Sequence, residues 1–224
     1  MLLASVDLGA LWLTLKVAAW ATAAALLLGV VFGFAIARMR WGGRRLIEAV
    51  LTLPMVLPPT VMGYYLIVVL GTNGPLGGWL KQHFDITLMF TWQGAVVAAS
   101  VVALPLVFTS ARAAFENVDP TFEKAARVLG AGELKVFLRV TLPLAMRGIA
   151  AGTMLAFARA MGEFGATLMI AGNIPGRTQT LSLAVYDAVQ SGNDALANVL
   201  VIVISVVCIV ILVAAGRLLE PRRV

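Results

Sequence analysis

The sequence predicts an all-α fold: a polytopic bundle of about five transmembrane helices that forms a single domain, residues 1–224. Hydrophobic residues make up 61% of the chain and charged residues only 12%. Several apolar runs are longer than the roughly 20 residues that cross a bilayer as a helix. We therefore expect a multi-pass protein embedded in a lipid bilayer. The predicted spans cover residues 11–37, 46–70, 88–111, 149–171 and 197–219.

Basic residues predict how these spans are oriented. Most of the 17 Lys and Arg residues follow the first span, lie between the third and fourth spans, or follow the fifth. Lys16, Lys81 and Arg177 belong to the other side. Because cytoplasmic loops carry an excess of Lys and Arg, we expect the N-terminus outside and the C-terminus in the cytoplasm. This bias accounts for the net charge of +6, so no nucleic-acid partner is expected.

The first span is too long for the core of a signal peptide and should remain in the mature protein. It contains Gly29 and Gly33 at the GxxxG spacing that lets transmembrane helices approach closely, and Gly148 and Gly152 repeat this spacing later in the chain. We interpret both pairs as ordinary packing positions.

The second span is interrupted by Pro54, Pro58 and Pro59. Proline removes backbone donors and bends helices, and such breaks survive in a membrane where neighbours or a cavity satisfy the freed carbonyls. We interpret this span as lining a path through the membrane, while a kink that serves only helix packing stays open as the alternative. The Gly-rich residues 71–78 predict a turn after it.

The segment between the third and fourth spans, residues 112–147, contains a short helix predicted on the cytoplasmic side. Asp119 is a candidate N-cap, Pro120 fits the first helical position, and Gly130 fits a left-handed C-terminal position. An apolar stripe at helical spacing is formed by Phe122, Ala125, Ala126 and Leu129. The spacing alone also fits a helix that lies on the membrane surface.

Two charged residues fall inside the fourth span. Arg159 and Glu163 are four positions apart, so they share a helical face near the middle of the bilayer. Charges at this depth usually face a protein interior or a water-filled path. Two interpretations stay open: the pair lines or locks a translocation path, or it is a structural ion pair between helices.

The cytoplasmic segment resembles the EAA loop of ABC-importer permease subunits. The resemblance rests on Glu123-Lys-Ala-Ala, on Gly130 seven residues after Glu123, and on the later Leu142-Pro143. In that family the loop forms coupling helices that dock into a groove of the ATPase subunit. The resemblance implies the type I ABC importer permease fold and an ATPase-coupling site formed by Phe122, Glu123, Ala125, Ala126, Leu129 and Gly130.

Three further motifs resemble molybdate importer permeases, and together the motifs extend over nearly the whole chain. They are LPMVLPPTVMG at residues 53–63, AFARAMGEFGA at 156–166 and NIPGR at 173–177. Tungstate and sulfate permeases share much of this pattern, so these anions stay as alternatives. From the proline break and the intramembrane charges, we predict a translocation path or gate at Pro54, Pro58, Pro59, Arg159, Glu163 and Gly165.

The same resemblance implies partners and a location. We expect a homodimer in the plasma membrane, which is the bacterial inner membrane, with two copies of an ABC ATPase subunit and an extracytoplasmic molybdate-binding protein.

Catalytic and cofactor motifs are not found. The sequence has neither a phosphate loop nor an H-E-x-x-H motif, and it has a single histidine, His83, in an outer loop. We therefore expect no cofactor and no metal site, and we expect ATP hydrolysis on another chain. A secondary anion transporter is the other class considered, but it should show several intramembrane acids and paired broken helices. This chain has essentially one intramembrane acid, Glu163, and one Pro-rich break, which favours the ABC permease.

Overall fold

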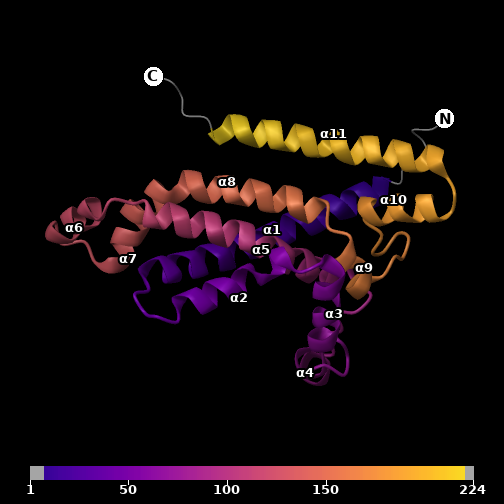
Figure 1. Ribbon diagram of the computed structural model, residues 1–224, viewed down its shortest axis with the longest axis horizontal. Coiled ribbons are helices and arrows are strands. Elements are labelled where there is room, and N and C mark those ends of the chain that lie inside the picture. Colours follow the sequence, from indigo (N-terminus) through magenta and orange to yellow (C-terminus); the bar gives the residue numbers. More distant parts are fainter. Residues whose placement is uncertain (1–7, 220–224) are drawn as a thin grey trace.

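The computed structural model describes residues 8–219, and every regular element within that range is a helix. Long helices lie along one another, and two groups of short helices occupy the ends of the molecule (Figure 1). The elements are α1 (Leu8–Arg38), α2 (Arg44–Val56), α3 (Pro59–Leu70), α4 (Pro75–Phe84), α5 (Trp92–Glu116), α6 (Pro120–Val128), α7 (Glu133–Val136), the π-helical turn η2 (Phe137–Thr141), α8 (Leu142–Met161), α9 (Gly165–Ala171), α10 (Leu181–Gln190) and α11 (Asp194–Leu219).

The centre of the bundle is formed by α1, α5 and α8, and the two most extensive helix contacts are those of α5 with α1 and with α8. Small residues allow this close approach. A Cβ atom on Gly29 would lie 2.8 Å from the Cβ of Val107, and one on Gly152 would lie 2.4 Å from the Cβ of Ser110. Packing and close backbone approach hold helices together in lipid, where no hydrophobic drive acts between them. The predicted GxxxG packing is confirmed at these positions.

The number of predicted spans agrees with the structure. Among residues 8–219, four helical segments are long and apolar enough to cross a membrane: Leu8–Arg38, Trp92–Glu116, Glu133–Met161 and Asp194–Ala214. The pair α2 and α3 makes a possible fifth, but its halves are bent by 114°. The expected interruption of the second span is therefore confirmed and is sharper than a kink. Leu57 is extended before Pro58 and Pro59, as expected for a residue that precedes proline.

The predicted fourth span, residues 149–171, is wrong as one continuous helix. The helix begins earlier, at Leu142, with Pro143 in its first turn, and it ends at Met161. A separate helix, α9, follows from Gly165. The break has a local cause, because the carboxylate of Glu163 accepts a hydrogen bond from the backbone N–H of Ala166 and so caps α9.

The connections after α3 and before α11 are more helical than predicted. Residues 71–74 form the expected turn, but Pro75 starts α4, so the prediction of a turn through residue 78 is wrong. Proline fits this first helical position because its missing N–H would have no partner there in any case. The helix α10 was also not predicted. In Figure 1, α3 and α4 form an arm that projects away from the long helices.

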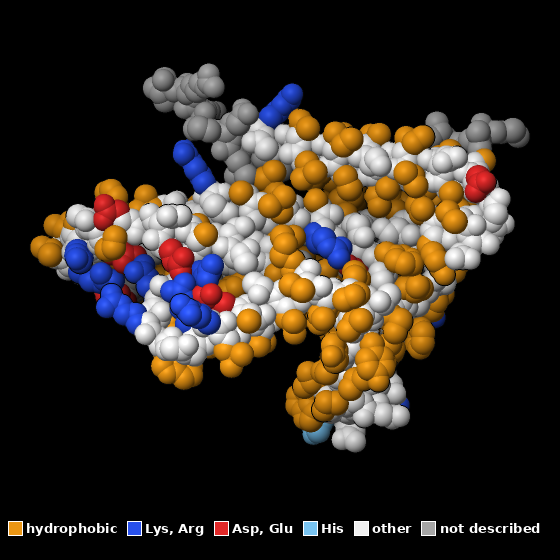
Figure 2. Space-filling view, viewed as in Figure 1, with side chains coloured by type: hydrophobic (Ala, Val, Ile, Leu, Met, Phe, Trp, Pro, Cys, Tyr) orange, Lys and Arg blue, Asp and Glu red, His pale blue; other side chains and the backbone are white. Residues whose placement is uncertain are grey.

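Charged side chains gather at the end of the molecule where α6 and α7 lie (Figure 2). We call this end the basic end and define it by Arg38, Arg44, Arg112 and Arg127, each of which forms an ion pair there.

Candidate functional site

The helix α6 has the boundaries that its sequence predicts. Asp119 caps it, since its Oδ1 accepts a hydrogen bond of 2.8 Å from the backbone N–H of Thr121. This hydrogen bond lowers the pKa of the Asp119 carboxyl. Gly130 follows the helix with φ at +80°, a left-handed conformation that residues with a Cβ adopt at a cost. The N-cap and the glycine terminator are both confirmed.

One face of α6 points away from the rest of the chain. Phe122 is 56% exposed and Leu129 86% exposed, and Ala125 is exposed as well. Ala126 is half-buried, whereas Val128 lies fully outside the bundle at 87% exposure. Three of the predicted coupling residues, Phe122, Ala125 and Leu129, therefore lie on an apolar surface that no described part of this chain covers. We call Phe122, Ala125, Val128 and Leu129 the outer face of α6.

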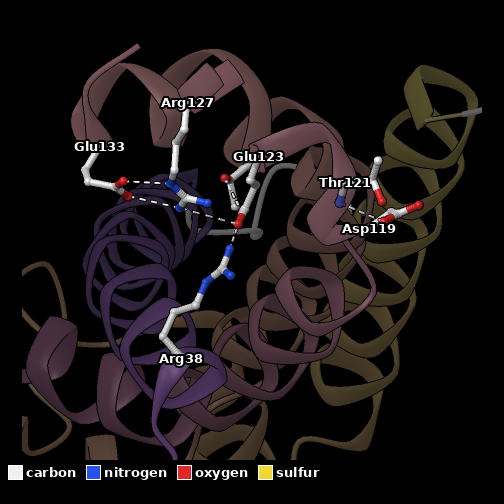
Figure 3. A network of polar contacts seen from close by, with 7 residues as sticks. Arg38, Asp119, Thr121, Glu123, Arg127 and Glu133 are labelled. Carbon is white, nitrogen blue, oxygen red and sulfur yellow. Dashed lines mark hydrogen bonds and ion pairs between the residues drawn. The ribbon is translucent and has the colours of Figure 1, made fainter. Parts of the chain in front are cut away.

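Glu123 lies on the opposite face of α6 and is only 2% exposed. Its carboxylate accepts a hydrogen bond from Nη2 of Arg38 (Figure 3). It accepts another, of 2.7 Å, from the hydroxyl of Thr141. Nη2 of Arg127 lies 3.8 Å from its second oxygen. Burial raises the pKa of this carboxyl, but the hydrogen bonds from Thr141 and Arg38 and the two nearby positive charges outweigh it, so the pKa lies below its ordinary value.

Arg127 extends this cluster to α7. Its Nε and Nη2 atoms donate to the two carboxylate oxygens of Glu133 at 2.7 and 3.0 Å (Figure 3). Paired bonds of this kind fix geometry better than a single ion pair does. Arg38, Glu123, Arg127, Glu133 and Thr141 form what we call the Glu123 cluster, which joins α1, α6, α7 and η2.

A second ionic cluster ties α2 to α5 at the same end. Glu48 receives Nε of Arg44 at 2.6 Å and Nη1 of Arg112 at 2.6 Å, and Arg44 also pairs with Glu116. Two carboxylates thus alternate with two guanidinium groups along the contact between α2 and α5. This arrangement holds the first half of the bent span against the centre of the bundle.

The charged pair inside the bundle is also formed. Nη1 of Arg159 lies 2.9 Å from Oε2 of Glu163, while Oε1 of Glu163 accepts the 2.9 Å bond from Ala166. The Glu163 side chain is 1% exposed and that of Arg159 is 35% exposed. The buried carboxylate therefore has one local hydrogen-bond donor, the Ala166 N–H, and one ion-pair partner, and the guanidinium group reaches partly out of the bundle.

The two breaks of the bundle lie against each other. A Cβ atom on Gly165 would lie 3.0 Å from the Cβ of Pro59, and one on Gly63 would lie 2.6 Å from the Cβ of Met169. Thus α9 packs closely on α3, directly after the bend. The structure brings Pro59, Gly165 and the capping residue Glu163 into one region.

The other two prolines lie differently. Pro58 is exposed at the bend, and Pro54 lies inside α2 on the other side of it.

A family model for the "binding-protein-dependent transport system inner membrane component" matches residues 25–224. The chain belongs to this family. It is 43% identical over 216 residues to the molybdenum transport system permease protein ModB of Escherichia coli K12. The alignment covers 96% of this chain and 94% of that protein. It is 34% identical over 190 residues to the sulfate transport system permease protein CysT of the same organism, over 85% of this chain and 68% of that protein.

Solved structures agree on the fold. A chain of the MetNI methionine ABC transporter, in an inward-facing conformation, superposes with a TM-score of 0.73 at 17% identity, over 94% of this chain and 93% of that chain. The predicted ABC importer permease fold is confirmed, and this binding-protein-dependent transport component is a multi-pass protein of the inner membrane.

Sequence reasoning about this transport component missed two features. Arg44 and Arg112 indicate only topology in the sequence analysis, although Arg44 precedes Glu48 by four residues, which is the spacing of a helical ion pair. Arg112 likewise precedes Glu116 by four residues, but it pairs with Glu48 instead. The partner of Glu123 on α1, Arg38, had no such signal because 85 residues separate the two in sequence. Between residues 8 and 219 no group of three His, Cys, Asp or Glu side chains could hold a metal ion.

Proposed function

We propose that this chain is the permease subunit of an ATP-driven molybdate importer and that it forms the translocation path while a separate subunit hydrolyses ATP. The observation that supports the substrate is the 43% identity to ModB of Escherichia coli across nearly the whole length of both proteins. Identity to the sulfate permease CysT is lower, at 34%, and covers less of both proteins. Tungstate shares the tetrahedral dianionic form of molybdate, so it is the alternative substrate that these sequence identities distinguish least from molybdate.

The outer face of α6 is the proposed docking surface for an ABC ATPase subunit. Its exposed apolar side chains have no partner in the described part of this chain, and an interface buries such anchors in pockets of the partner. The basic end then faces the cytosol, in agreement with the excess of Lys and Arg there. This orientation leaves the N-terminus outside and the C-terminus in the cytoplasm.

The region around the two breaks is the proposed path or gate. Pro54, Pro58, Pro59, Arg159, Glu163 and Gly165 are its residues, and Pro58 and Pro59 are exposed on the isolated chain. Because Glu163 balances the charge of Arg159, an oxyanion would meet a weak site that it can leave again, as conduction requires.

One chain with this number of spans does not enclose a path. We therefore propose a homodimer with the path between its subunits, served by two ATPase subunits and an extracytoplasmic molybdate-binding protein.

Reconstitution in proteoliposomes tests this function. The permease would be assembled with its ATPase and supplied with its binding protein, and uptake of molybdate, tungstate and sulfate would be measured with and without ATP. We expect ATP-dependent uptake of molybdate in preference to sulfate. Equal or faster sulfate uptake would refute the substrate, and oxyanion flux through the purified permease without the ATPase would refute the whole class.

A further inference from the structure

The helix α6 is attached to the bundle through one buried side chain. Of the nine residues Pro120–Val128, Glu123 alone is buried. The helix therefore has almost no apolar attachment to the bundle. It packs mainly on α7 and η2, which follow it in sequence, and its link to α7 runs through Gly130 and Gly132.

The neighbouring segment η2 is attached in the ordinary way. The ring of Phe137 lies edge-on against the ring of Phe34 on α1, with 4.7 Å between centroids, and Val136 is buried beside it. Such aromatic contacts stabilise a packing arrangement without any ionic group. Of these two neighbouring elements, α6 is the one attached mainly through polar contacts.

That attachment meets three elements at one carboxylate. Arg38 is the last residue of α1, and Thr141 is the last residue of η2, directly before α8. Both donate to the same oxygen of Glu123. A displacement of α6 is therefore applied to the ends of α1 and α8, which are two of the three helices at the centre of the bundle.

We propose that Glu123 is a positioning residue that connects the coupling helix to α1 and η2, and that it makes no contact with the ATPase. The proposal rests on the function proposed above, in which the outer face of α6 docks on that subunit. It separates two tasks on one helix: Phe122, Ala125, Val128 and Leu129 bind the partner, and Glu123 passes the movement on. Coupling energy travels through such contiguous polar contacts when they join rigid elements.

A double-mutant cycle tests this connection in the assembled transporter. The variants are Glu123→Gln, Arg38→Met and the double variant, and three quantities are measured: co-purification of the ATPase, ATP hydrolysis, and molybdate uptake. Arg38→Met is expected to fold, because the Arg38 side chain is 42% exposed and methionine keeps its aliphatic stem. Arg40→Met is the matched control, since Arg40 is exposed two residues further on and no ion pair is found for it among residues 8–219.

We expect each single variant to lower uptake per ATP hydrolysed by about fivefold, a change within the range seen for mutations along coupling networks. Uptake per ATP hydrolysed in the double variant should be no lower than in the more impaired single variant, because both substitutions remove the same contact. ATPase co-purification should stay at the wild-type level in all of them. Arg38→Lys should restore most of the coupling, since lysine keeps the positive charge.

Two results would overturn the proposal. Additive losses in the double variant would show that Glu123 and Arg38 act separately, and loss of ATPase co-purification in Glu123→Gln alone would show that Glu123 belongs to the docking surface. A wild-type complex that hydrolyses ATP without taking up molybdate would refute the substrate instead. The double-mutant cycle would then be measured on the rate of ATP hydrolysis. Additive changes in that rate would again show that Glu123 and Arg38 act separately.

Discussion

Glu123 and Glu163 are both 2% exposed and both pair with an arginine, yet their contacts reach very different distances along the chain. Glu163 binds Arg159, four residues before it, and the N–H of Ala166, three residues after it. Glu123 binds Arg38, 85 residues away, and Thr141, 18 residues away. One glutamate shapes a local break, and the other joins separate helices.

This difference indicates different mechanical roles. The contacts of Glu163 stay within the end of α8 and the start of α9, so they can persist whichever way the helices move. The contacts of Glu123 cross between α6, α1 and η2, so relative movement of these elements must either carry the cluster along or break it. A buried polar group is costly to leave without a partner, and this cost favours movement as a unit.

The largest effect on transport is expected from Gly130→Pro. Proline fixes φ near −65°, whereas Gly130 has φ at +80°, and the N–H that proline lacks donates to the carbonyl of Arg127. The end of α6 should be rebuilt, and the contact between Arg127 and Glu133 lost with it. We expect uptake in membrane vesicles to fall by more than about tenfold, which corresponds to 1.4 kcal/mol or more.

The matched control is Gly132→Ala, since Gly132 has φ at −69° and a Cβ atom would meet nothing within 4 Å. This control should transport like the wild type. Normal uptake in Gly130→Pro would remove α6 from the coupling mechanism and, with it, the contrast between the two glutamates.

The next effect concerns the outer face of α6. Leu129→Asp places a charge on a side chain that is 86% exposed, so the stability of the permease itself should hardly change. If this face docks in an apolar pocket of the ATPase, binding should weaken by about 2 kcal/mol or more, as for an interface hot spot. Titration of the ATPase against the permease in nanodiscs measures this.

Lys81→Asp, on the exposed outer helix α4, is the control for added negative charge. Unchanged ATPase affinity in Leu129→Asp would show that the outer face is not the docking surface.

Local rules predicted much of this structure, and contacts between distant residues account for the rest. Asp119, Pro120 and Gly130 define α6 through capping chemistry that involves neighbouring residues only, and the sequence was sufficient there. Pro58 and Pro59 likewise predicted the break in the second span. The size of the 114° bend was not predictable, because it depends on how α3 packs against α9.

The break at Glu163 shows why hydropathy alone misled. Residues 149–171 are apolar enough for one span, but an acidic side chain that caps a new helix competes with helix continuation. Nothing in the sequence around Glu123 identified Arg38 as its partner. The helical stripe placed Glu123 on another face of α6 than Phe122 and Leu129, whereas its burial and its contacts required the fold.

A moderate effect is expected from Glu163→Gln. The substitution removes the partner of Arg159 and the charged cap of α9 together, and leaves a guanidinium group without its counter-charge. We expect a loss of about 1–3 kcal/mol, which is typical for a buried polar group that loses its partner. Thermal unfolding in detergent measures it.

The double variant Arg159→Met, Glu163→Gln should recover part of this stability, since replacing both members of a buried pair often costs little. Transport decides between the two interpretations of the pair. Reduced uptake in the stable double variant would support a place in the path or gate, while wild-type uptake would return both residues to a structural role.

The smallest effect is a dependence of stability on acid. The pKa of Glu123 lies below its ordinary value, so the folded state binds this proton more weakly than the unfolded state does. The stabilisation is complete above the unfolded pKa of about 4.3 and is lost as the pH falls through the lower, folded value. Neutral pH should therefore leave the cluster of Arg38, Arg127 and Glu133 around Glu123 intact.

Thermal unfolding between pH 8 and pH 3 checks this sign. Glu123→Gln should lower stability at neutral pH and reduce the further loss below about pH 4, because glutamine has no proton to gain. Glu48→Gln serves as a comparison, since Glu48 also pairs with two arginines, in a cluster that does not include α6. If only Glu123→Gln also changes the acid dependence of protease cleavage between α5 and α7, Glu123 is the group that holds α6 in place. Equal changes in both variants would mean that the two ionic clusters hold the basic end together as one unit. Glu123 would then have no separate role in attaching α6 to the bundle.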